Sequence, residues 1–241
     1  MSDNILAMAD TVERPSKLAA IEACTLLNAV TADERAILID RSHMAYAERG
    51  ETIWMAGAPS EFSAIVATGF LKLTKGTMSG QEVAMDLIGP GQLVGLLAAI
   101  EGRPFPLTAV AVTSTWYLKI PTSAFMEVYH ASAPLKDQIV RTMGPRLRRA
   151  HSMMTRLSTG SAEERIAAVL FLLAESYGQT KGIKIRLGVP LTRQEIGEMA
   201  GTTVETTIRV MSKWQKDGLI STDHQIVTIL DSPRLEAVLR E

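Results

Sequence analysis

The chain has 241 residues, of which 46% are hydrophobic and 21% charged, and its formal net charge at pH 7 is −1. This length and composition predict a globular protein with two domains or one large one. Because an almost neutral chain has no overall attraction for a polyanion, any nucleic-acid-binding surface must be local. The single cysteine, Cys24, excludes an intrachain disulfide and a cysteine-only metal cluster, and we expect it to be a small buried residue.

Neither a targeting segment nor a membrane span is predicted. The first 17 residues lack the basic start and continuous apolar run of a signal peptide. The longest uncharged runs, 87–100 and 104–118, fall short of the roughly 18 apolar residues that a transmembrane helix needs. We therefore expect a cytoplasmic protein with no membrane partner.

The first half of the chain predicts a flexible tail over 1–17 and a β-roll domain over 18–132. From Leu18 to Glu48 apolar residues recur at three- and four-residue spacings, which is typical of helix. Beyond Arg49, glycines separate short β-branched or apolar runs, and such runs bounded by turn residues indicate an antiparallel barrel or roll. These runs are ETIWM, SAIVATG, FLKLTK, EVAMDLI and LTAVAVTSTWYLKI.

A long helix is predicted over 133–157. Its apolar residues repeat at spacings of 3, 4, 3, 4 and 3, the heptad seam by which helices pack lengthwise. Packing on its own roll is the alternative, but the arginine-rich opposite face favours a homodimer seam. Pro145, which follows Gly144, should bend this helix rather than end it. The seam residues are Val140, Met143, Leu147, Ala150, Met154 and Leu157, and the opposite arginines are Arg141, Arg148, Arg149 and Arg156.

The C-terminal segment has the pattern of a winged helix-turn-helix. We place a hinge at 158–161 and a separate domain at 162–241, whose first helix begins with the capping box Ser161–Glu164. Two more capping boxes, Thr192–Glu195 and Thr202–Glu205, flank a turn at Gly201. The second helix should run over 203–217 and stop at Gly218. LISTDHQIVTIL then predicts a two-stranded wing turning near Asp223–His224, and IKIRL at 183–187 a strand that pairs with it.

The second helix of this motif has two faces. We expect Val204, Ile208, Met211, Trp214 and Leu219 to pack inward, and Glu205, Arg209, Lys213 and Lys216 to form an outer stripe. Arginine binds guanine in bidentate fashion, and a glutamate one turn away can accept from the cytosine amino group and hold the guanidinium. Hydroxyls and lysines would contact phosphates and fix the register. An ordinary solvated helix face is the alternative. The predicted DNA-binding residues are Glu205, Arg209, Thr206, Ile208, Thr202, Thr203 and Lys213.

Four fragments in chain order resemble the Crp–Fnr superfamily of bacterial transcription regulators over 18–239: RGETIWMAGAPSEFSAIVATGFLKL, DLIGPGQLVG, PLTAVAVTSTWYLKIPTSAF and VETTIR. The resemblance implies an α+β fold with an antiparallel β-roll sensor of the cyclic-nucleotide-binding type, a long dimerisation helix and a winged helix-turn-helix. It also implies a homodimer on an inverted repeat of double-stranded DNA, with RNA polymerase as a partner of an activator. Glu205 and Arg209 match the family's base-contacting residues, whereas Ile208 replaces a serine or glycine and would meet a thymine methyl.

The effector site departs from the family pattern. Cyclic-AMP binders carry a glutamate where this chain has Leu96 and an Arg-Ser pair where it has Phe105-Pro106-Leu107, so a cyclic phosphate would lack its counter-charge. An iron–sulfur sensor would need several cysteines. We expect an apolar pocket between the roll and the long helix, which could hold haem, an apolar molecule or no ligand. His43, His130 and His151 are nominal candidates for a haem ligand, and we expect each to be a surface or satisfied histidine. The pocket residues would be Leu93, Leu96, Leu97, Phe105, Leu107 and Met143.

Two other classes of function are alternatives to a DNA-binding regulator. A ligand-sensing module acting through a protein partner would leave Glu205 and Arg209 dispensable. An enzyme would need a Ser/His/Asp set, a metal-ligand spacing or a phosphate-binding loop, and the four histidines are scattered. The sequence therefore predicts neither a catalytic nor a metal site.

Overall fold

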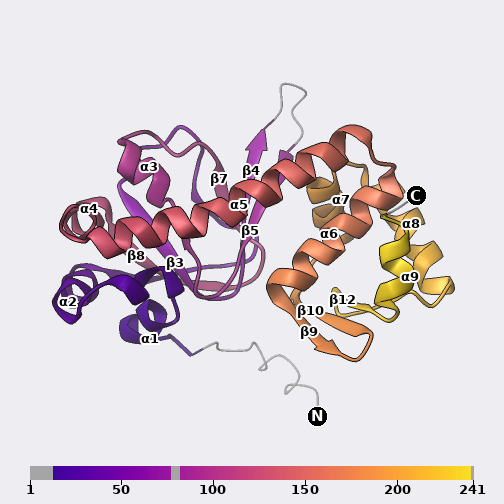
Figure 1. Cartoon of the computed structure of the whole chain (residues 1–241), viewed down its shortest axis with the longest axis horizontal. Helices are drawn as coiled ribbons and strands as arrows, with labels where there is room; N and C mark the ends of the chain where they lie inside the picture. Colours follow the sequence, from indigo (N-terminus) through magenta and orange to yellow (C-terminus); the bar gives the residue numbers. More distant parts are fainter. Residues whose placement is uncertain (1–12, 77–81, 240–241) are drawn as a thin grey trace, which may run out of the picture.

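The protein has two lobes joined by one long helix, α5 (Ala133–Thr159), as Figure 1 shows. A computed structural model describes residues 13–76 and 82–239, without the side chains of 149, 152, 153 and 155–159. Most of the tail predicted for 1–17 thus lies outside the described residues. No helix in the described ranges is long and apolar enough to cross a lipid bilayer.

The N-terminal lobe is the predicted antiparallel roll. Its strands are β1 (His43–Ala47), β2 (Thr52–Trp54), β3 (Phe62–Thr68), β4 (Leu71–Gly76), β5 (Glu82–Ile88), β6 (Leu93–Val94), β7 (Thr108–Ala111) and β8 (Thr115–Pro121). They form two sheets, with strand orders β1-β8-β3-β6 and β2-β7-β4-β5. Because one buried cluster takes residues from every one of these strands, the two sheets share a core.

Helices cover the roll. They are α1 (Lys17–Glu22), the 3-10 turn η1 (Thr25–Ala29), α2 (Ala32–Arg41), α3 (Leu96–Glu101) and α4 (Thr122–Ala131). The helical pattern expected as far as Glu48 is wrong over 43–47, which form β1 and pair with β8. The two buried residues of this strand, Met44 and Ala47, are three positions apart, a spacing that is also typical of a helix, so only the pairing with β8 distinguishes the two.

The long helix α5 continues through Pro145, as predicted, and Pro145 is exposed. It ends at Thr159, so Ser158 and Thr159 are helical although we predicted them in the hinge. Gly160 is the first residue there with a poor helix propensity. The next helix, α6 (Ala162–Tyr177), begins with the predicted capping box, in which Ser161 Oγ accepts from the Glu164 N–H and the Glu164 carboxylate accepts from the Ser161 N–H.

The C-terminal lobe is the predicted winged helix-turn-helix. After α6 it contains β9 (Gly178–Lys181), β10 (Lys184–Pro190), α7 (Arg193–Ala200), α8 (Val204–Lys216), β11 (Ile220–Asp223), β12 (Ile226–Ile229) and α9 (Ser232–Ala237). The sheet order is β11-β12-β10-β9, which confirms that IKIRL pairs with the wing and adds β9, which we did not predict. The wing turns at His224 and Gln225, both with positive φ, as a tight two-residue hairpin requires.

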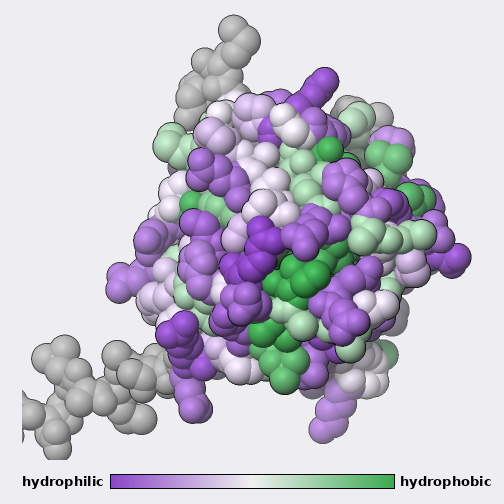
Figure 2. Space-filling model, turned by 90° about the vertical axis from the view of Figure 1, so that its left-hand side faces the viewer, coloured by the Kyte–Doolittle hydropathy of each residue, from purple (hydrophilic) through white to green (hydrophobic). Residues whose placement is uncertain are grey.

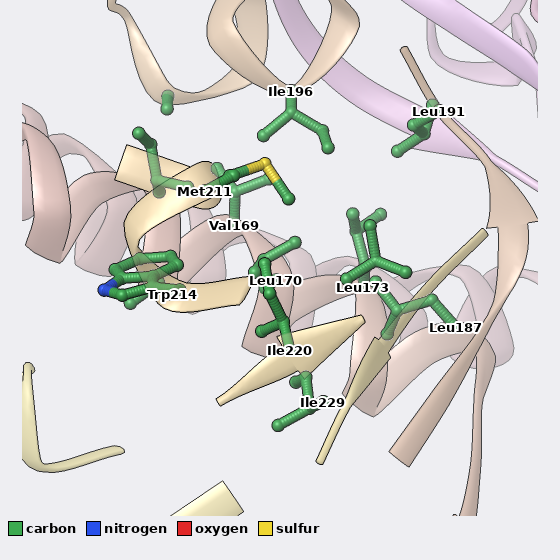
Figure 3. Packing of buried hydrophobic residues seen from close by; sticks show 14 of the residues in the cluster. Val169, Leu170, Leu173, Leu187, Leu191, Ile196, Met211, Trp214, Ile220 and Ile229 are labelled. Carbon is green, nitrogen blue, oxygen red and sulfur yellow. The ribbon is translucent and has the colours of Figure 1, made fainter. Parts of the chain in front are cut away.

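One hydrophobic core holds this lobe together. Trp214 and Met211 of α8 are 1% and 0% exposed and pack with Leu170 of α6, Ile196 of α7 and Ile229 of the wing (Figure 3). Burial of large side chains at this density stabilises each by roughly 1.5–3 kcal/mol. The core therefore fixes the orientation of α8 relative to α7 and the wing.

The two lobes also contact each other. Leu87 and Val112 of the roll belong to the same buried cluster as the helix-turn-helix core. Lys72 of β4 forms an ion pair with Glu198 of α7, with Nζ and Oε2 2.7 Å apart and the two side chains only 15% and 14% exposed. The Arg49 guanidinium lies 3.2 Å from the Glu195 carboxylate. Helix α7 is thus docked on the roll.

We predict that the Lys72–Glu198 pair supports this docking. Lys72→Met is expected to lower the free energy of unfolding by about 1–2 kcal/mol, because Glu198 is left largely buried without its cation, and Lys72→Met/Glu198→Met should recover most of the loss. Urea denaturation measures both values. The exposed Arg41–Glu127 pair is the control, and its disruption should cost less than about 1 kcal/mol. Equal losses for the two pairs would contradict a role in docking.

The end of the molecule that carries α2 and α4 lies far from α8 (Figure 1). Figure 2 looks onto that end, where hydrophilic residues surround a band of hydrophobic ones. The outer face of the roll and the helix-turn-helix are therefore separate surfaces at opposite ends of the long axis.

Candidate nucleic-acid interface

Helix α8 starts one residue later than the sequence suggested. Thr203 is its N-cap, with Oγ1 accepting from the Thr206 N–H at 3.3 Å, so the predicted Thr202–Glu205 capping box is wrong. Thr202 instead completes the end of α7, because its N–H donates to the Gly197 carbonyl at 3.0 Å. Glu205 consequently stands in the first turn of α8, exposed and unused by the cap, where a carboxylate is favoured by the helix dipole.

The buried face of α8 differs in part from the prediction, because Thr207 and Val210 are buried and Val204 is only half-buried. Ile208 is 48% exposed and does not pack inward, whereas Thr207 is fully buried. The Thr207 hydroxyl donates to the Thr203 carbonyl at 3.0 Å, which satisfies the polar group inside the core. Met211 and Trp214 are buried as expected. Ile208 therefore lies among the exposed residues of the helix rather than in the core.

Two glycines set the approach of α8 to α7. Gly201 has a φ of +58° at the end of α7, a left-handed conformation that favours glycine. A Cβ on Gly197 would lie 2.9 Å from Oγ1 of Thr207, so only glycine allows the two helices this close contact. Sequence reasoning identified Gly201 but missed Gly197, whose position within EIGEMAG was the available signal.

The predicted outer stripe is exposed on the described chain. Glu205, Arg209 and Lys216 face solvent, and Thr203 is exposed at the start of the helix. Thr202 and Thr206 are half-buried. Lys213 is 60% exposed and its Nζ lies 3.1 Å from Glu163 in the first turn of α6. A carboxylate and a guanidinium thus lie one turn apart at the start of a helix, with a cation further along it.

Arg193 and Arg165 are basic residues of this lobe that serve the fold. Arg193 donates to Thr222 Oγ1 of the wing at 2.8 Å, and burial lowers the pKa of its guanidinium from the ordinary value. Arg165 donates to the carbonyls of Gly160 and Ala200, at 3.0 and 2.9 Å, and so ties the hinge to the turn. Neither contact could be predicted from the sequence.

The six predicted effector-pocket residues do not share one cavity. Leu93, Leu96 and Met143 line a cavity of about 130 Å³ between η1, the mid-roll turn and α5, together with polar groups of Gln92, Thr142 and Arg146. Leu97 is 47% exposed. Phe105 and Leu107 lie in the roll, where Trp54 Nε1 donates to the Leu107 carbonyl at 3.0 Å.

The roll interior does not fit a cyclic nucleotide. Phe105 is 3% exposed and stacks on Trp54, with ring centroids 4.4 Å apart, and Phe62 packs edge-on against both rings. Leu96 is also buried, where cyclic-AMP binders carry the ribose-binding glutamate. Aromatic side chains thus occupy this part of the roll, and a phosphate there would lack the arginine that balances its charge.

The described residues contain no cluster of side chains arranged to bind haem iron or a metal ion. His43, His130 and His151 are exposed on three different elements, β1, α4 and α5. No group of three or more His, Cys, Asp or Glu residues that could hold a metal ion occurs in the described ranges. Cys24 is buried as expected, and burial raises the pKa of its thiol to about 11.

Comparisons with known proteins agree with this architecture. Residues 164–238 match the Crp-like helix-turn-helix domain, and residues 45–132 match the cyclic nucleotide-binding domain. The chain is 32% identical to the transcriptional activator protein anr of Pseudomonas aeruginosa, over 79% of this chain and 78% of that protein. The chain belongs to the Crp–Fnr family of transcription regulators. This regulator is therefore a DNA-binding protein and not an enzyme, as the sequence predicted.

Further relatives support the same assignment. This regulator is 31% identical to the transcriptional activator protein FnrA of Stutzerimonas stutzeri, over 77% of this chain and 75% of that protein. Its fold is similar to that of FixK2 from Bradyrhizobium japonicum, with a TM-score of 0.72 at 21% identity over 82% of this chain and 96% of that one. The α+β architecture of roll, long helix and winged helix-turn-helix is thereby confirmed.

Proposed function

We propose that this regulator binds an inverted-repeat operator as a homodimer and reads a G·C pair in each half-site with Arg209 and Glu205. The observation that carries this proposal is the start of α8: Thr203 makes the cap, so the Glu205 carboxylate is exposed one turn from the exposed Arg209. Guanine presents two acceptors and cytosine an amino donor in the major groove, which this pair of side chains matches.

The neighbouring side chains extend the contact. Ile208 lies beside Arg209 in sequence and is 48% exposed, so it presents an apolar surface that suits a thymine methyl group. Thr202, Thr203 and Thr206 at the start of the helix supply hydroxyls for phosphates. Lys213, whose side chain is 60% exposed, reaches a phosphate when it leaves the half-buried Glu163 carboxylate.

The dimer seam is supported by exposed apolar side chains on α5. Val140, Leu147 and Met154 recur every seven residues and are 72%, 58% and 63% exposed, although each is a large hydrophobic residue. Ala150 is also exposed, whereas Met143 packs against the buried cluster between the covering helices and the roll, and Leu157 lies outside the described side chains. A second copy of the chain would bury this stripe, since two heptad seams are self-complementary.

We place the gating step in the cavity lined by Leu93, Leu96 and Met143, since aromatic residues fill the roll interior. Its mixed lining suits a small non-nucleotide effector better than a cyclic nucleotide. Because anr and FnrA are described as transcriptional activators, we infer activation with RNA polymerase as the partner, in the cytoplasm where the DNA lies.

Selection of bound sites from random DNA tests the proposal. We expect a symmetric motif with half-site centres about one helical turn apart, roughly 34 Å, and one G·C pair fixed in each half. Parallel selection with cell extract shows whether an effector is needed. Enrichment of asymmetric or unrelated sequences under both conditions would overturn the operator assignment.

A separate prediction concerns the phosphate contact of Lys213. Lys213→Gln should weaken binding to all DNA sequences to a similar extent and lower the salt slope of binding by about 1, because one phosphate contact is lost. Fluorescence anisotropy at several salt concentrations measures the slope. Lys75→Gln removes an exposed lysine of β4 and is the control. An unchanged slope in the Lys213 variant would show that Lys213 stays with Glu163 on DNA.

A further inference from the structure

A second cavity of about 130 Å³ lies where the roll, α5 and the helix-turn-helix lobe meet. Strand β5 and Gln92 form the roll side, Arg146 comes from α5, and α6 and α7 supply Val169, Leu172 and Met199. The cavity thus exists only when the lobes are docked. Gln92 and Arg146 also line the cavity beside η1, so these two side chains separate the two spaces.

The polar end of this cavity has hydrogen-bond donors for which the described residues supply no acceptor. Oε1 of Gln92 accepts from the Gly89 N–H at 2.9 Å and lies 3.0 Å from the Tyr177 hydroxyl, which donates to the Leu87 carbonyl at 2.8 Å. These contacts fix the orientation of the Gln92 amide through its oxygen. The described residues supply no acceptor for its Nε2–H groups. Within the described residues, no carboxylate forms an ion pair with the half-buried Arg146 guanidinium.

We propose that this cavity between the lobes binds a small carboxylic acid with an apolar body, whose carboxylate pairs with Arg146 and with Nε2 of Gln92. The planar guanidinium matches a carboxylate in bidentate fashion. Val169, Leu172 and Met199 provide the apolar wall for the rest of the molecule. A cavity of about 150 Å³ accommodates benzene, so the ligand is of that size.

The charges around the cavity favour a monoanion. Arg146 is the cation of the lining, and Asp86 is an exposed carboxylate at the rim that has an interaction of its own. A phosphate dianion would bring one charge more than Arg146 neutralises into a partly apolar space, at a desolvation cost. A monocarboxylate matches the single guanidinium, and Asp86, which also lines the cavity, disfavours a second negative charge on the ligand.

Such a ligand would act on the arrangement of the lobes. Because its contacts come from both lobes and α5, it binds only the docked arrangement and shifts the population toward it. The orientation of α8 relative to the dimer seam is then held while the ligand is bound. This regulatory consequence rests on the function proposed above, whereas the binding itself does not.

Titration calorimetry of the full chain with benzoate, without DNA, tests the site. We expect one saturable site per chain, and binding at least about tenfold weaker for benzyl alcohol, which has the same body without the charge. Arg146→Gln should weaken benzoate binding by at least about tenfold. Gln92→Glu, which keeps the oxygen facing Gly89 and Tyr177, should do the same.

Arg141→Gln, an exposed arginine on the same helix, is the matched control and should bind benzoate as the parent protein does. Absence of benzoate binding at millimolar concentrations, equal binding by Arg146→Gln, or binding of inorganic phosphate in place of benzoate would each overturn the site. Circular dichroism confirms that the variants are folded.

Operator-binding measurements distinguish ligand binding in the cavity from its effect on DNA affinity. Benzoate should change the affinity of the parent protein for its selected operator and leave that of Arg146→Gln unchanged. Benzoate binding with an unaltered operator affinity would support the site and overturn the coupling. Loss of operator recognition alone would refute the proposed function and leave the calorimetric result intact.

Discussion

Leu147→Glu is expected to yield monomers and to lower operator affinity by more than about 100-fold, because two joined half-site contacts gain roughly 10²–10⁴ in avidity over one. Leu147 is 58% exposed on the single chain, so the substitution should leave each protomer folded. In the dimer it would place two carboxylates in an apolar seam, where their desolvation is uncompensated. Sedimentation velocity reports the mass, and anisotropy with an operator duplex reports the affinity.

The same helix provides the control for this experiment. Arg141→Glu introduces the same charge at an exposed position of α5 on the face opposite the predicted seam and should leave the dimer intact. Met154→Glu, at a residue that is 63% exposed, should repeat the effect of Leu147→Glu. A dimer that persists in both seam variants would show that the chains associate through another surface.

Arg209→Ala is expected to cost about 1–3 kcal/mol on the selected operator, because the bidentate contact to guanine is lost. On an operator whose G·C pair has been replaced, the same variant should lose little. Competition anisotropy with the two duplexes measures this difference. The contrast distinguishes base reading from phosphate binding, since a phosphate contact would be lost equally on both duplexes.

Glu205 provides the companion measurement. Glu205→Gln keeps the size of the side chain and should relax the preference for cytosine at the paired base, because the acceptor becomes an amide. Since Thr203 and not Glu205 makes the cap, the variant should keep its thermal stability. If Arg209→Ala loses the same affinity on cognate and altered duplexes, Arg209 contacts phosphate and does not read a base.

Local patterns in the sequence predicted most of the C-terminal lobe. The capping boxes Ser161–Glu164 and Thr192–Glu195, the turn at Gly201 and the wing all formed as expected, since each depends on residues a few positions apart. The start of α8 differed because two adjacent residues could each make the cap. Thr202 and Thr203 are equivalent as caps in the sequence, and the hydrogen bond from Thr202 to Gly197 across the turn decides between them.

Long-range contacts decided what the sequence could not. Residues 43–47 form a strand because β8, distant in the chain, pairs with them, and Thr207 is buried in place of Ile208 because α7 approaches at Gly197. Likewise, only the folded roll brings the rings of Trp54 and Phe105 together. Only the contact between the two lobes places Arg146 beside two cavities.

The sequence by itself therefore determined most of the elements and the capping boxes Ser161–Glu164 and Thr192–Glu195, because hydrogen bonds and periodicities within a few residues specify them. The tertiary structure alone decided which face of α8 is buried and how α7 docks on the roll through Lys72 and Glu198. Burial and ion pairing depend on which surfaces meet, and residues far apart in the chain bring those surfaces together.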